Sequence, residues 1–244
     1  MGLSYFKKSL AVAGIAAAVV LGAQSVAAAT FNFGAISNPG STFETTSGTR
    51  NTGEADWNTL VGGPGVGILD TTSGISVIGS ASTSLSGSAL AYFDNNPGLG
   101  VCSVVTTSGQ CNPANDDNVG AIGGSSNSGD GTFETLTLTF SEAVNVTDLL
   151  FRAEGHGLFT GTVLINGALT SITNGAWSGL FSGTVFDFQY VTVTCPNNTT
   201  GCGASNEFYL SSATVAAVPI PAAGLLLLTG LGGLVATRRR RKAA

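Results

Sequence analysis

The sequence predicts an all-β domain in the middle of the chain, built as an antiparallel, jelly-roll-like β-sandwich. Helical periodicity is almost absent between residues 30 and 217, where short apolar runs alternate with turns rich in Gly, Ser, Thr and Asn. The run TLTLTF, residues 135–140, alternates without a break between apolar side chains and threonines, which is the period of a half-buried strand. Many short strands joined by glycine-rich turns favour two packed antiparallel sheets.

Several segments have the alternation, or the enrichment in β-branched and aromatic residues, that is typical of strands. In chain order, the expected strands are residues 30–36, 74–80, 88–94, 135–140, 144–152, 160–167, 184–194 and 207–217. Residues 95–131 are instead rich in Asn, Asp, Gly and Ser, so we expect long loops there.

The segment FETLTLTF-SEAVN-VTDLLFR, residues 133–152, predicts a hairpin with its turn at 141–145. If Phe140 faces Val146 across this hairpin, Glu134 faces Arg152. Glu134 has the parity of the apolar residues on its strand, so its carboxylate points toward the core and requires a partner. We therefore expect a structural ion pair between Glu134 and Arg152 at the edge of the sandwich.

The N-terminal segment, residues 1–29, has the three parts of a secretory signal peptide. Lys7 and Lys8 precede an apolar stretch at 10–21, and the alanines at 27–29 offer an A-x-A cleavage site before Thr30. We expect this segment to direct export and then to be removed.

The C-terminal segment, residues 218–244, predicts a single transmembrane helix followed by a basic tail. Residues 218–237 are twenty uncharged residues, and about 20 are needed to span a bilayer. The tail at 238–242 would stay cytoplasmic by the positive-inside rule. Its members are Arg238, Arg239, Arg240, Arg241 and Lys242. Together with the export signal, this places the middle domain, residues 30–217, outside the inner membrane.

The motif that opens this segment resembles a known sorting signal. Its residues are Val218, Pro219, Ile220, Pro221 and Ala222. A short proline motif, a transmembrane stretch and a terminal arginine cluster, in this order, are similar to the VPLPA variant of the PEP-CTERM signals of Gram-negative bacteria, with isoleucine where leucine is usual. The resemblance implies that an exosortase-type membrane protease is a partner and removes the helix. It also implies release of the protein to the cell surface or the extracellular matrix.

The middle domain resembles, more loosely, β-sandwich domains that are often attached to such signals. The resemblance rests on NPGLGV, DNVG, ETLTLTF and the histidine after FRAEG. It implies a fold but no settled activity.

The charge of the middle domain narrows the classes of partner. It has two arginines against all fourteen acidic residues, a formal charge of −12. Binding to phosphates needs a basic surface, so nucleic acid and anionic membrane surfaces are excluded as partners of this domain. Divalent cations, neutral sugars and other surface polymers stay open.

Four cysteines in two close pairs predict disulfides in an oxidising compartment. Of the three possible pairings we favour Cys102–Cys111 and Cys195–Cys202, each closing a loop rich in small polar residues. A zinc site is disfavoured because neither pair has the usual ligand spacing and the chain has one histidine.

A calcium site is the open alternative to a domain without cofactors. Its candidate ligands are Asp94, Asp116, Asp117, Asp130 and Glu134. Calcium takes six to eight oxygen ligands, but the spacing matches no EF-hand loop. Asp and Asn also stabilise turns through their own backbone, and we favour that interpretation.

Other residues admit a catalytic or a sugar-binding interpretation. His156, between two glycines, could act as a general base, but a turn histidine is the favoured interpretation. Trp57, Trp177, Tyr92 and Tyr190 are the aromatic side chains on which a saccharide could stack.

These observations favour an exported structural or interaction protein of the cell surface or extracellular matrix, and not an enzyme. A carbohydrate-binding module, with or without bound calcium and with an extracellular polysaccharide as its partner, is the first alternative. A secreted hydrolase is the second.

Overall fold

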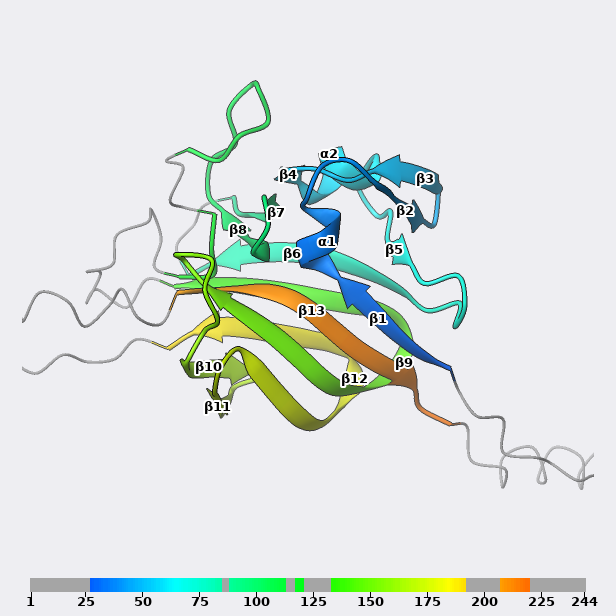
Figure 1. Ribbon diagram of the computed structural model, residues 1–244, viewed down its shortest axis with the longest axis vertical. Coiled ribbons are helices and arrows are strands. Elements are labelled where there is room, and N and C mark those ends of the chain that lie inside the picture. The colour runs from blue at the N-terminus through cyan, green and yellow to red at the C-terminus, as the bar shows by residue number, and fades with distance from the viewer. Residues whose placement is uncertain (1–26, 85–87, 113–116, 121–132, 192–206, 220–244) are drawn as a thin grey trace, which may run out of the picture. The chain divides into compact units, whose positions relative to one another are not determined.

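The computed structural model describes residues 27–84, 88–112, 117–120, 133–191 and 207–219, which belong to one compact unit, Val26–Pro219. This unit is antiparallel and almost entirely β, which confirms the predicted all-β class (Figure 1). Within these ranges no helix is long and apolar enough to cross a bilayer. Most of the expected signal peptide and transmembrane helix lies outside the described residues.

Thirteen strands and two short helices make up the described unit. In chain order they are β1 (Ala28–Asn32), α1 (Phe33–Ile36), β2 (Thr42–Thr45), β3 (Gly48–Asn51), β4 (Ala55–Asp56), α2 (Trp57–Val61), β5 (Ile68–Leu69), β6 (Ser76–Thr83), β7 (Leu90–Asp94), β8 (Gly98–Cys102), β9 (Glu134–Ala153), β10 (Gly161–Ile165), β11 (Ala168–Ile172), β12 (Ala176–Tyr190) and β13 (Phe208–Ala217).

All thirteen strands join in one hydrogen-bonded sheet, where the sequence predicted two. The main path runs β3-β2-β5-β6-β9-β13-β8-β7-β4, with β1 attached to β13 and the β10–β11 hairpin attached to β12. Strand β9 lies at the centre of this path, since it pairs with β6, β12 and β13.

Strand β9 is one uninterrupted strand of twenty residues, so the expected hairpin is wrong. The segment 141–145 contains neither Gly nor Pro, which are the residues that most favour a turn. Val144 and Asn145 pair on both edges, with β12 on one side and β13 on the other. Long-range pairing of the backbone on both sides therefore keeps this segment extended.

The register that placed Glu134 opposite Arg152 is wrong for the same reason. The Glu134 carboxylate accepts hydrogen bonds from Ser103 Oγ and from the backbone amide of Gly120, both at 3.2 Å. Arg152 Nη1 donates to the carbonyl oxygen of His156 at 3.0 Å. The two side chains thus have separate hydrogen-bond partners.

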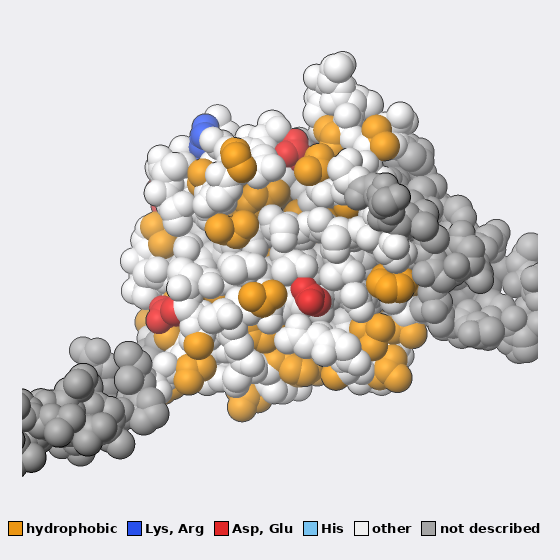
Figure 2. All heavy atoms as spheres, turned by 180° about the vertical axis from the view of Figure 1, so that it is seen from behind, with side chains coloured by type: hydrophobic (Ala, Val, Ile, Leu, Met, Phe, Trp, Pro, Cys, Tyr) orange, Lys and Arg blue, Asp and Glu red, His pale blue; other side chains and the backbone are white. Residues whose placement is uncertain are grey.

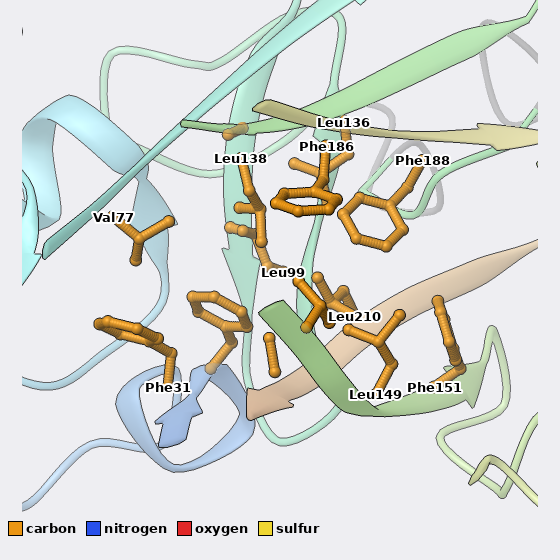
Figure 3. Packing of buried hydrophobic residues seen from close by; sticks show 14 of the residues in the cluster. Phe31, Val77, Leu99, Leu136, Leu138, Leu149, Phe151, Phe186, Phe188 and Leu210 are labelled. Atoms are coloured by element: carbon orange, nitrogen blue, oxygen red, sulfur yellow. The ribbon is translucent and has the colours of Figure 1, made fainter. Parts of the chain in front are cut away.

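The long sheet folds back on itself around one core. The first half of β9 pairs with β6 and with the C-terminal part of β12, and the second half pairs with β13 and the N-terminal part of β12. Leu136 and Leu138 from the first half share a core with Leu149 and Phe151 from the second (Figure 3). Phe188, which pairs with Leu136, lies 6.2 Å from the ring of Phe151. The period-2 pattern of β9 therefore supplies both walls of the same core.

The first and last strands of the unit pair with each other. β1 lies antiparallel to β13, with Ala28 opposite Ala216, so the start of β1 and the end of β13 lie side by side (Figure 1). Ala28 and Ala29 already belong to β1. Cleavage before Thr30 would therefore shorten this strand to three residues.

The shared core predicts a large cost for truncating Phe151. Its ring is fully buried and packs against Phe159, Phe188 and Phe208 at 6.4, 6.2 and 5.5 Å between ring centroids. We expect Phe151→Ala to lower the free energy of unfolding by about 3–5 kcal/mol, measured by urea denaturation. Thr139→Ala, at an exposed position of the same strand, is the control and should change it by less than about 0.5 kcal/mol. A loss below about 1 kcal/mol for Phe151→Ala would contradict the shared core.

Candidate functional site

The β7–β8 hairpin brings the predicted residue Asp94 against β13. Asn96 and Gly98 adopt positive φ angles of 88° and 131° in its tight turn. A Cβ atom at Gly98 would lie 2.5 Å from the carbonyl oxygen of Leu210, so only glycine allows this close approach to β13. Asp94, the last residue of β7, consequently lies beside Tyr209.

His156 completes the contact from the turn that follows β9. Its Nε2 atom lies 3.2 Å from Asp94 Oδ2, and its ring meets the ring of Tyr209 edge-on at 6.1 Å. The residue has a φ of 61°, a left-handed conformation that few non-glycine residues adopt. Its carbonyl oxygen is held by Arg152, so the turn is fixed at the backbone as well as at the side chain.

Asp117 joins the same cluster from a short segment between β8 and β9. The Tyr209 hydroxyl donates to Asp117 Oδ1 at 2.5 Å. Two backbone hydrogen bonds between Val119 and Phe208, of 2.8 and 3.2 Å, hold the segment on β13. A Cβ atom at Gly100 would lie 1.9 Å from the Asp117 carbonyl oxygen, so this segment packs tightly against β8.

Burial sets the electrostatics of this Asp94–Asp117–His156–Tyr209 cluster. Burial raises the pKa of the Asp117 carboxyl to about 7, the Tyr209 hydrogen bond opposes the rise, and the charge of Asp94 adds to it. Burial also raises the pKa of Asp94, an effect that His156 opposes and Glu54 strengthens. The pKa of the Tyr209 hydroxyl is raised by burial and by Asp117, so the tyrosine stays a neutral donor.

Glu54 and Tyr92 extend the cluster toward the disulfide. The Tyr92 hydroxyl donates to Glu54 Oε1 at 2.9 Å and accepts from the Cys111 amide at 3.4 Å. Tyr92 is fully buried with Cys102 and Cys111 in a small second core. Burial and the neighbouring Glu54 carboxylate raise the pKa of Tyr92.

The expected Cys102–Cys111 disulfide is present. Its Cα atoms lie 5.8 Å apart, within the usual range for such a bond. Closing a loop with a sequence separation of nine residues stabilises the fold by about 2.5 kcal/mol in the chain-entropy model. The other expected pair, Cys195–Cys202, lies outside the described residues.

The structure brings together only part of the predicted calcium set. Asp94 and Asp117 converge, whereas Glu134 bonds to Ser103 and Gly120. Asp116 and Asp130 lie outside the described residues. Within the described ranges, no group of three or more acidic, histidine or cysteine side chains has an arrangement that could hold a metal ion. Calcium binding therefore stays a hypothesis that these contacts do not favour.

Most of the predicted sugar-stacking side chains are buried. Trp57 stacks on Phe93 at 5.3 Å and donates its Nε1 hydrogen to the Val66 carbonyl, and Tyr92 and Tyr190 are also buried. Trp177 is half-buried and stacks on Phe181 at 4.6 Å. The first three rings therefore have no free face for a saccharide.

No local pattern in the sequence indicates that Tyr209 links two acids. The strand at 207–217 was predicted, but a strand pattern carries no information on the partner of the Tyr209 hydroxyl. Only the β8–β13 pairing, which joins residues far apart in sequence, places its hydroxyl between Asp94 and Asp117.

Chemically, the cluster is a set of mutually satisfied groups. The hydroxyl of Tyr209 and the imidazole of His156 each hold a carboxylate. None of the clustered side chains lines either of two hollows that described residues form near β2. Comparison of the chain with protein-family models, with curated proteins and with solved structures found no match.

The raised pKa of Asp117 predicts a specific dependence of stability on pH. The pKa of Asp117 is higher in the folded protein than in the unfolded chain, where it is about 4. Its contribution to the free energy of unfolding is therefore complete below pH 4 and is lost as the pH rises toward 7. Asp117→Asn keeps the oxygen that accepts from Tyr209 but cannot ionise beside Asp94 and Glu54. The free energy of unfolding of the wild type should fall between pH 5 and pH 8. In Asp117→Asn we expect this fall to be smaller by about 2 kcal/mol.

Urea denaturation at the two pH values measures this difference. The matched control is Asp148→Asn, an exposed acid on β9 that also accepts one hydroxyl hydrogen bond, from Ser178. Equal pH dependence in Asp117→Asn and the wild type would show that Asp117 is not buried as described.

Proposed function

We propose that the protein is an exported, non-enzymatic structural or interaction protein of the cell surface or extracellular matrix. The observation that carries the proposal is the buried Cys102–Cys111 disulfide, which packs against Tyr92. Such a bond forms and persists in oxidising compartments outside the cytoplasm. An N-terminal export signal at residues 1–29 accounts for how the chain reaches one.

The pairing of β1 with β13 supports delivery between two terminal sorting segments. The expected signal peptide, residues 1–29, ends within β1, and the proline motif at 218–222 follows β13 directly. Because the start of β1 and the end of β13 lie side by side, either segment can tether the folded domain without unfolding it. An exosortase-type membrane protease acting at 218–222 would then free the domain from its inner-membrane anchor.

The folded-back sheet is compatible with a stable structural domain that has no catalytic activity. We assign it the jelly-roll-like sandwich architecture, with the two halves of β9 in opposite layers. In the cluster around Tyr209 the acids are held internally, since Tyr209 holds Asp117 and His156 holds Asp94. A general base needs a reachable substrate proton, and His156 lines neither hollow near β2.

The surface chemistry favours neutral partners over anionic ones. Charged side chains are sparse on the face shown in Figure 2, where uncharged polar and backbone atoms predominate. Of the two arginines in the middle domain, Arg50 donates to the Val61 carbonyl and Arg152 to that of His156. Neither offers the basic surface that nucleic acid requires. An extracellular polysaccharide without charge is the partner class that fits best.

Fractionation combined with intact mass tests this function. We expect the mature protein outside the cytoplasm, with a mass that reports loss of residues 1–29, loss of the C-terminal helix and two disulfides. Replacing both Pro219 and Pro221 by alanine should leave the helix attached and hold the protein in the membrane fraction. Pro39→Ala, in a loop after α1, is the matched control and should be processed normally. Full-length protein in the cytosol with free thiols would refute export.

A further inference from the structure

A hollow of about 220 Å³ lies between the start of the unit and the β2–β5 region. The strands that border it are sparsely paired. β2 pairs with β5 at a single position, Thr45 opposite Ile68, while β1 pairs only with β13 among the described strands. Consecutive residues of β1, β2 and β5 line the gap, so strand edges as well as side chains border it.

Three polar side chains on its wall are each fixed by one hydrogen bond. Glu44 Oε1 accepts from the Thr49 hydroxyl at 2.7 Å, and Asp70 Oδ1 accepts from the Ser73 amide at 2.7 Å. Asn32 Oδ1 accepts from the Ala35 amide at 2.9 Å, as the N-cap of α1. These bonds hold each side chain in one orientation.

The second polar atom of each side chain remains available. Within the described residues, Glu44 Oε2, Asp70 Oδ2 and Asn32 Nδ2 have no hydrogen-bond partner. Because Asn32, Glu44 and Asp70 all line the hollow, they give it two acceptors and one donor on side chains that are already held in place. Groups held in this way lose little conformational entropy when a ligand binds.

The remainder of the wall combines apolar residues with four hydroxyl-bearing residues, Thr30, Ser41, Thr42 and Thr52. Phe31 and Ile36 are buried beneath it, and Phe43 is half-buried. A hollow that combines aromatic and aliphatic surface with a few convergent polar groups is typical of small-molecule sites. A pyranose ring has the complementary surface, with apolar C–H faces and hydroxyl groups at its edge.

We propose that this hollow binds one neutral saccharide unit of an extracellular polymer, an inference that names the ligand class of the proposed matrix function and rests on it. The carboxylates of Glu44 and Asp70 accept from sugar hydroxyls, the Asn32 amide donates to one, and Phe43 contacts the ring. Two carboxylates on the wall and a domain charge of −12 exclude an anionic sugar. Neither carboxylate requires a cationic ligand, since each already accepts a hydrogen bond.

Titration of the purified full-length protein with neutral hexose disaccharides, followed by calorimetry and by ligand-observed NMR, tests the site. Galactosamine, glucuronate and an uncharged extended peptide serve as competing probes. We expect at least one neutral disaccharide to bind with a dissociation constant of about 1 mM. Its affinity should not depend on salt.

Two kinds of variant locate the binding. The double variant Glu44→Gln, Asp70→Asn keeps the oxygens that accept from Thr49 and Ser73 but replaces each free acceptor by an amide donor. The affinity for the disaccharide should therefore fall at least about fivefold. Ala35→Trp fills the hollow from an exposed position of α1 and should abolish binding. Asp148→Asn, matched to Glu44 by its single 2.7 Å hydroxyl bond, should bind like the wild type.

Results that contradict the saccharide site differ from results that contradict export of the protein. No binding of any neutral disaccharide, or binding unchanged in both hollow variants, would overturn the site while leaving an exported structural protein. Salt-sensitive selectivity for galactosamine, or binding of the peptide alone, would overturn the assigned ligand class. A cytosolic protein that binds disaccharide in this hollow would instead overturn the proposed function.

Discussion

The passage of β9 through both halves of the sheet is the constraint on which the rest of the structure depends. One strand of twenty residues supplies apolar side chains to both walls of the core, and its partners β6, β12 and β13 follow its direction. The aromatic contact between Phe151 and Phe188 joins the walls. Because β13 is fixed by β9, the position of β1, of β8 and of the residues they carry follows from it.

The cluster around Tyr209 and the hollow beside β2 both depend on strand pairing along one edge of β13, since β9 occupies its other edge. Near the start of β13, β8 pairs at Leu210 and brings Asp94 to Tyr209. Further along the same edge, β1 pairs with residues 212–216, and within the described residues no second strand pairs with β1 where it borders the hollow. The first arrangement satisfies its polar groups internally, whereas the second leaves polar atoms available. The hollow, and not the acidic cluster, therefore has polar atoms that are available to a ligand.

Local patterns were enough to predict the class of fold and part of its chemistry. The alternation in residues 135–140 correctly predicted a half-buried strand, and the spacing of Cys102 and Cys111 correctly predicted their disulfide. The turn expected at 141–145 is wrong because partners distant in sequence pair with both edges of this segment. The Tyr209–Asp117 bond joins residues 92 positions apart, and no local period encodes such a contact. Burial of Trp57 against Phe93 depends on the same long-range packing.

Native-state amide hydrogen exchange along β9 tests the shared core most directly. If both halves line one core, the amides of Leu138 and Phe151 should exchange only through global unfolding, with equal free energies of opening and equal dependence on denaturant. Those free energies should match the value from urea denaturation of the whole domain. A first half that exchanges by a separate, lower-energy opening while the second half stays protected would show two independent sheets and would contradict the account.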